Sequence, residues 1–275
     1  MTGSKLNRHF TVMFRMLPCE YGGKKIHARS VKTFMKHLIT VFVLCMFIAM
    51  GAFEGLAGDD KEEGGAESAW LDSFAVADRD FVTTGRNRYW ILEPGYRLLL
   101  KSKTEGVEIT VLNETRKIGG IETRIVEERE WKKDRLVEVS RNFFAVDRKT
   151  NDIYYFGEEV DMYKGGKVTG HEGAWLHGSE GARYGLIMPA KPGVGFKHYQ
   201  EIAPDAAMDR AEIISVNETL KTPAGTFEGC LKVDETTPLE PGEHSIKLYA
   251  PEVGLVKDGA TKLVEYGFVK GGKAK

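Results

Sequence analysis

Hydrophobic and polar residues alternate with a period of two along most of the chain after about residue 90. Residues 107–111 read VEITV, residues 121–125 read IETRI, and residues 136–139 read LVEV. Alternation of this kind is typical of strands that are buried on one face of an antiparallel sheet. We therefore predict a mainly β domain over residues 91–270, preceded by a separate N-terminal leader.

Short turn sequences separate these alternating runs. The first half of the domain contains KTEG at 103–106, KIGG at 117–120 and KGG at 164–166, and the second half contains TPAG at 222–225 and KDG at 257–259. Glycine, asparagine and aspartate tolerate the backbone angles of tight turns, so the connections are expected to be hairpins. A sheet of about ten strands must curl, close or split in two. We expect a large curved antiparallel sheet, as a partly closed barrel or a sandwich, with long crossing loops over residues 170–204.

The N-terminal segment has the pattern of an export signal. The run from Leu38 to Phe53 contains no charged residue, Lys36 precedes it, and the small residues Gly55 and Ala57 follow it. This order of basic, apolar and small residues is typical of a signal peptide, here with cleavage after Ala57. We assign residues 1–57 to a basic leader and signal helix, and residues 58–90 to a flexible or partly helical leader.

An uncleaved signal is the alternative. Residues 38–53 would then anchor the protein in the inner membrane, with the basic flank on the cytoplasmic side. Under either hypothesis the β domain lies outside the cytoplasm, in the periplasm or as a secreted protein. The membrane is expected as a partner only if this anchor is retained.

The charge of the exported part limits the classes of partner that it can bind, and its cysteine content limits the role of Cys230. Residues 1–57 hold eight basic and two acidic residues, which leaves the rest of the chain with a formal charge of about −7. Such a surface repels phosphate backbones, so we expect no nucleic-acid partner. Cys19 and Cys45 fall in the leader. Cys230 alone remains, in a strand-like setting, and we expect it to be buried as a small apolar side chain.

The sequence motifs for metal and phosphate sites are incomplete. Residues 147–158 resemble an EF-hand count, but Asp152 stands where the loop requires glycine, so a polar hairpin turn explains the segment better. His171 and His177 have no recognised zinc-ligand spacing. Neither a P-loop nor a dinucleotide-binding motif occurs. We expect no metal and no cofactor.

Catalytic motifs are also missing. Ser179 lacks the flanking glycines of a nucleophile elbow. Carboxylates cluster at 158–161 and at 201–209, and paired carboxylates can serve a glycosidase, but an acid-rich chain produces such neighbours by chance. We therefore predict no catalytic residue.

Four aromatic residues are candidates for a ligand site. Trp175, Tyr184, Phe196 and Tyr199 lie in the Gly/Pro-rich middle of the chain. A curved sheet can enclose an apolar cavity, and loop aromatics could line its mouth. The alternative is that these side chains belong to the ordinary core.

Five stretches together resemble an uncharacterised family of exported bacterial proteins with a curved, half-barrel-like sheet. They read NFFAVD at 142–147, IYYFGE at 153–158, IMPA at 187–190, TPAGTF at 222–227 and LYAPEVGLV at 248–256. The resemblance implies export and a β fold. That family has no assigned activity, so it implies no catalytic residue.

Three functions remain open. The first is an envelope protein that binds a lipid, another apolar molecule or a partner protein without catalysis, and an internal apolar cavity would favour it. The second is a cell-wall-directed hydrolase, which would need converging carboxylates or histidines in a cleft. The third is a purely structural protein with neither feature.

Translation that starts at Met35 would leave a signal of ordinary bacterial length, because residues 35–45 read MKHLITVFVLC. We expect a chain that begins at Met35 to be exported as fully as the complete chain, because it keeps the basic flank, the apolar run and the cleavage site. Fractionation of cells that express each version measures this. Loss of export from the shorter chain would show that residues 1–34 are needed.

Overall fold

The structure, a computed structural model, describes residues 69–75 and 79–269. The expected signal helix, the cleavage site and the alternative anchor at 38–53 lie outside the described residues. Within them the chain forms strands, turns and loops. No helix of the described part is long and apolar enough to cross a membrane.

Eighteen strands are described, and most are joined to the next by a tight turn. The first nine are β1 (Phe81–Val82), β2 (Gly85–Asn87), β3 (Trp90–Leu92), β4 (Tyr96–Lys101), β5 (Glu105–Ile118), β6 (Ile121–Lys132), β7 (Arg135–Asp147), β8 (Ile153–Lys164) and β9 (Lys167–Gly170). The others are β10 (Trp175–Leu176), β11 (Arg183–Met188), β12 (Lys197–Tyr199), β13 (Glu201–Ile202), β14 (Arg210–Thr222), β15 (Gly225–Thr236), β16 (Ser245–Ala250), β17 (Gly254–Asp258) and β18 (Thr261–Phe268).

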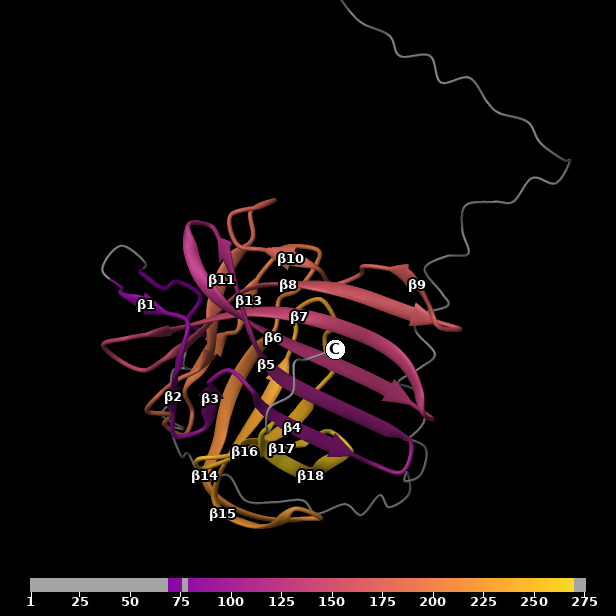
Figure 1. The fold of residues 1–275 in the computed structure, drawn as a ribbon. Coiled ribbons are helices and arrows are strands. Elements are labelled where there is room, and N and C mark those ends of the chain that lie inside the picture. Colours follow the sequence, from indigo (N-terminus) through magenta and orange to yellow (C-terminus); the bar gives the residue numbers. More distant parts are fainter. Residues whose placement is uncertain (1–68, 76–78, 270–275) are drawn as a thin grey trace, which may run out of the picture. The chain divides into compact units, whose positions relative to one another are not determined.

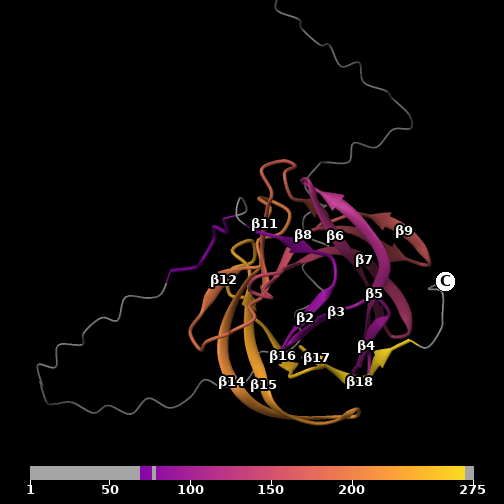
Figure 2. The same cartoon turned by 60° about the vertical axis from the view of Figure 1, so that its left-hand side comes forward.

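Sixteen of these strands form one antiparallel sheet. Its main path runs β12-β14-β15-β16-β17-β18-β4-β5-β6-β7-β8-β11-β13, and β2 pairs separately with β3. Two runs of hairpins, β4 to β8 and β14 to β18, are joined where β18 pairs with β4. The sheet curves until it nearly closes into a barrel (Figures 1 and 2). The predicted mainly β fold with a large curved sheet is confirmed.

One short segment joins the two ends of the sheet. Lys197–Tyr199 pairs with β14, and Glu201–Ile202, one residue later, pairs with β11. The chain therefore changes partner at Gln200. This segment lies in the stretch where long loops were expected, and it brings the ring of strands close to closure.

The loop between β7 and β8 is a hairpin turn, as its polar residues predicted. Asp147 accepts hydrogen bonds from the backbone N–H groups of Lys149 and Thr150, and Asn151 has a positive φ of 63°. Asparagine tolerates this left-handed conformation better than most residues. Among the described residues, no group of three or more metal-binding side chains is placed to hold an ion.

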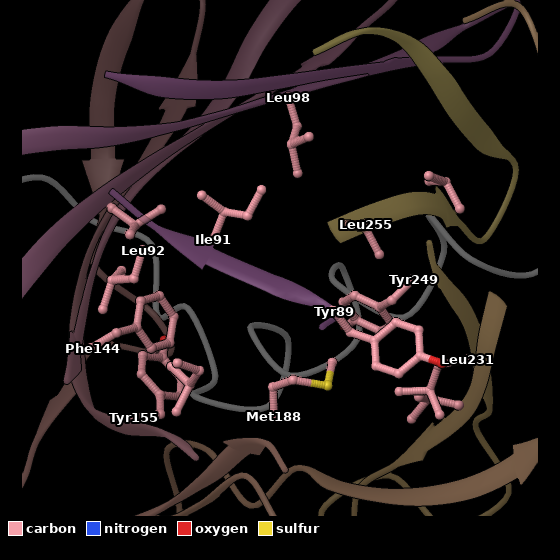
Figure 3. Close-up of a cluster of buried hydrophobic side chains, with 14 of the residues drawn as sticks. Tyr89, Ile91, Leu92, Leu98, Phe144, Tyr155, Met188, Leu231, Tyr249 and Leu255 are labelled. Carbon is pink, nitrogen blue, oxygen red and sulfur yellow. The ribbon is translucent and has the colours of Figure 1, made fainter. Parts of the chain in front are cut away.

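The hydrophobic core has two parts. The larger part fills the inside of the curved sheet, where the β2–β3 hairpin lies in the middle of the ring of strands (Figures 2 and 3). Tyr89 at its turn donates a hydrogen bond from its hydroxyl to the carbonyl of Gly229. The smaller part lies around Phe143, Phe156 and Tyr184, with Phe81 of β1 packed against it. Cys230 is buried, as expected from its sequence setting.

The described residues before residue 91 contain short strands. Its described residues 69–75 and 79–80 form no helix, and β1, β2 and the first residue of β3 fall within 81–90. Buried Arg124 of β6 fixes the turn between β1 and β2, because its guanidinium donates to the Thr83 carbonyl and to the hydroxyls of Thr83 and Thr84. The first described strand therefore begins at Phe81, within the residues assigned to the leader.

Gly185 is expected to be required where β11 meets the closing segment. A Cβ atom at this position would lie 2.7 Å from the Tyr199 carbonyl oxygen and closer still to that of Gln200, and both are backbone atoms. We expect Gly185→Ala to lower the free energy of unfolding by about 1–3 kcal/mol, as overpacked sites do. Urea unfolding measures it. Gly193→Ala is the control, because a Cβ there has open space; equal stability of the two variants would contradict the prediction.

Candidate functional site

A cavity of about 220 Å³ lies inside the curved sheet. Residues of β3 to β8 and β15 to β17 line it, together with Ile187 of β11 and residues 200–209 beside the closing segment. Its walls therefore come from both runs of hairpins, and it exists only because the sheet curls back on itself.

One wall is apolar and aromatic. Trp90 meets Phe144 edge to face with ring centroids 5.2 Å apart, and Phe144 stacks on Tyr155 at 4.7 Å. Tyr249 lies across from them, with its ring tilted against Trp90 at 6.3 Å. Leu98 and other aliphatic side chains complete this wall (Figure 3). Such a surface suits the apolar body of a small molecule.

The rest of the lining is strongly acidic. Six carboxyl side chains and one basic side chain, Lys247, face the cavity. The carboxyl groups belong to Glu128, Glu158, Glu201, Asp209, Glu235 and Asp258.

Two of the carboxylates reach the cavity because of β-bulges. Tyr155 and Glu158 are three residues apart, so a regular strand would point them to opposite faces. The pairing of β8 with β7 shifts between these positions, and Gly157 has a φ of 144°. An extra residue in a strand re-aims the side chains that follow it. Both therefore line the cavity.

A β-bulge has the same effect in β17. Leu255 and Asp258 are also three residues apart, and the register with β16 shifts between the pairs that contain them. Both side chains line the cavity. Each bulge therefore lets one strand place both an apolar or aromatic side chain and a carboxyl group in the lining of the cavity.

Lys247 is held by two carboxylates. Its Nζ lies 2.7 Å from Glu235 Oε2 and 3.8 Å from Asp258 Oδ2. Burial by itself lowers the pKa of Lys247, but Asp258 and Glu235 outweigh burial and hold the pKa well above its ordinary value. The Gln200 amide donates a 2.9 Å hydrogen bond to Glu235 Oε1, so both oxygens of this carboxylate are occupied.

The carboxyl groups away from Lys247 resist ionisation. Burial, followed by repulsion from Glu130, raises the pKa of Glu128 to about 8. Burial raises the pKa of Glu158 to about 7, although the Tyr155 hydroxyl acts in the opposite direction. Burial and then Asp209 place the pKa of Glu201 well above its usual range. Near neutral pH these groups therefore take up protons more readily than exposed carboxylates do.

The four aromatic residues predicted from the sequence lie elsewhere. Trp175 packs edge-on against Tyr155 at 5.2 Å, outside this cavity. Tyr184 stacks on Phe156 in the smaller core. Phe196 lies against His198, and Tyr199 lies edge-on to Trp70. The structure therefore distributes them among separate clusters and does not gather them around one site.

Sequence reasoning named Glu158, Glu201 and Asp209 only as members of carboxylate clusters, and it missed the other residues that line the cavity. Glu128 follows Val126 at the spacing that puts both on one face of a strand, and this was the available signal. The alternation did not reveal which face would be enclosed. Glu158 and Asp258 gave no such signal, because the bulges reverse their expected sides.

Comparisons with known proteins do not identify the family of this chain. No protein-family model matches the chain, and no curated protein matches it significantly. A crystal structure of a candidate lipoprotein from Parabacteroides distasonis ATCC 8503 is similar with a TM-score of 0.33 and 12% identity, over 67% of this chain and 100% of that one. Likeness at this level does not establish a shared fold or function.

Stability is expected to fall as the cavity carboxylates ionise. The folded-state pKa of Glu128, about 8, lies above its ordinary value of 4.5, so the folded protein binds this proton more tightly than the unfolded chain. The stabilisation is complete below about pH 4.5 and is lost as pH rises through about 8. Glu130 and Glu138, with Asp258, oppose ionisation of Glu128, whereas Lys247 favours it.

Glu128→Gln tests this directly. We expect it to reduce the loss of unfolding free energy between pH 5.5 and 8.5 by on the order of 2 kcal/mol, since one pKa unit corresponds to about 1.4 kcal/mol. Urea unfolding at the two pH values measures it, with exposed Glu122→Gln as the control. An unchanged pH dependence in Glu128→Gln would contradict the prediction.

Proposed function

We propose that the protein is an exported, non-catalytic binding protein that holds one small ligand with an apolar body inside its curved sheet. The observation that carries the proposal is the partly open cavity that aromatic and aliphatic side chains from both halves of the sheet line on one side. An internal apolar cavity is the feature that distinguishes a ligand-binding role from a purely structural one. Export rests on the signal-peptide pattern of residues 36–57.

The volume limits the ligand. An engineered apolar cavity of about 150 Å³ in another protein accepts benzene. A cavity of about 220 Å³ therefore suits one ring with a short chain, which corresponds to roughly ten non-hydrogen atoms. A long acyl chain or a polysaccharide segment exceeds this space.

A hydrolase is the second candidate, because carboxylates converge in the cavity. A glycosidase needs one carboxyl group that is protonated and a second that is ionised, so their pKa values are pushed apart. In this cavity the resolved shifts of Glu128, Glu158, Glu201 and Asp209 are all upward. This uniform direction, together with the small volume, favours binding over hydrolysis.

Filling the cavity should abolish ligand binding. Ile109 of β5 lines the cavity and is only partly buried, so Ile109→Trp places an indole in the space a ligand would use. We expect 2-phenylethanol, a neutral probe of suitable size, to bind the wild-type protein and to lose its binding in this variant. Isothermal titration calorimetry measures the affinity.

Ile214→Trp is the matched control, because Ile214 is 38% exposed on β14 and lies outside the cavity lining. Circular dichroism of each variant verifies that it is folded. Equal affinity of the probe for the wild type and for folded Ile109→Trp would place binding elsewhere and reject the proposal.

A further inference from the structure

We infer that the ligand of this cavity carries a protonated amine, held by Glu128, Glu158 and the hydroxyl of Tyr249, on a small aromatic or aliphatic body. This inference rests on the proposed function, because it assigns the chemical class of the molecule that the cavity holds.

The charge balance of the lining is the first argument. Lys247 is already paired with Glu235 and Asp258, so it offers little to an anionic ligand. Within the described chain, no basic side chain lies within ion-pair distance of Glu128 or Glu158. Glu128 and Glu158 therefore have no ion-pair partner among the described residues.

The free energy of an enclosed carboxylate is the second argument. A charge removed from bulk water is costly unless it is paired and hydrogen-bonded. A bound ammonium would supply that pairing through charge-assisted hydrogen bonds, which are stronger than neutral ones. A neutral ligand would displace water from these carboxylates without replacing its hydrogen bonds, and an anionic ligand would add repulsion.

Tyr249 is the third and independent argument. The residue is 4% exposed and lines the cavity, yet its hydroxyl makes no hydrogen bond within the described residues. Glu235, Lys247, Asp258 and Glu128 all influence its pKa, which places the hydroxyl at the acidic side of the cavity. A hydroxyl that lines a cavity without a protein partner can donate to or accept from a bound molecule. An ammonium group has three donors and can satisfy it together with two carboxylates.

The aromatic wall of the cavity supports the same class of ligand, an amine. Trp90, Phe144 and Tyr155 form one group of contacting rings that lines the cavity together with the carboxyl groups. Aromatic faces attract cations and also cover the apolar body of a ligand. The combination of ring faces, carboxylates and an acceptor hydroxyl fits an arylalkylamine or a short alkylamine of the size that the cavity allows.

Three probes of nearly equal shape test the inference. Phenethylamine is cationic, 2-phenylethanol is neutral and 3-phenylpropionate is anionic, and each is titrated calorimetrically into the purified protein at pH 8.5. We expect phenethylamine to bind at least about tenfold more tightly than the alcohol, because a hydrogen bond to a charged group contributes about 1.5–3 kcal/mol. We expect no measurable binding of 3-phenylpropionate.

Two variants assign the amine to its proposed partners. Glu128→Gln and Tyr249→Phe should each weaken the binding of phenethylamine by up to about tenfold, with Glu128→Gln the larger effect, and should weaken the binding of 2-phenylethanol by a smaller factor. Glu122→Gln, on an exposed position of the same strand, should change neither affinity.

The outcomes separate the two proposals. Equal binding of amine and alcohol, or tightest binding of 3-phenylpropionate, would overturn the amine class while leaving the cavity as a ligand site. Failure of all three probes would overturn both. Amine-selective binding that Glu128→Gln does not weaken would overturn the assignment to this acidic wall.

Discussion

The closure of the sheet by one short segment is the constraint on which the rest of the structure depends. Lys197–Tyr199 and Glu201–Ile202 pair with strands from opposite ends of the sheet, so backbone hydrogen bonds of a few residues hold these two ends together. Gly185 permits this approach because it has no Cβ. Gln200, between the two short strands, donates a hydrogen bond to Glu235 of β15, and both residues line the cavity. Closure and cavity are therefore parts of one arrangement.

The acidic wall is an exception to the ordinary composition of a protein interior. Interiors exclude charges that lack a partner, and here six carboxyl groups and one lysine line a partly open cavity. Their raised pKa values show the cost of this arrangement. Carboxylates placed this way suit recognition of a cation better than they suit stability of the fold, which connects the electrostatics of the cavity to its proposed ligand.

The sequence predicted the architecture better than the site. Period-two alternation and turn residues were sufficient for a large curved antiparallel sheet, because each signal acts over a few residues of one hairpin. The cavity depends on contacts between residues far apart, such as Trp90 with Tyr249. Glu158 and Asp258 were beyond reach for a second reason, because a single bulged residue moves a side chain to the other face without changing the composition of the strand. The aromatic residues in the middle of the chain were chosen as ligand-site candidates because of their residue type. Whether a residue lines the cavity depends instead on which face of the sheet its side chain occupies.

The pairing of β18 with β4 has a consequence for the order of folding. These strands are separated by about 160 residues, and Phe268 lies opposite Tyr96. Contacts between residues so distant in the chain form slowly, because a long loop must close before they are made. The edge of β4 accordingly stays without its neighbour until the last strand of the domain is available. A chain released before residue 261 would present that edge to other molecules, and an open edge of this kind readily recruits a foreign strand.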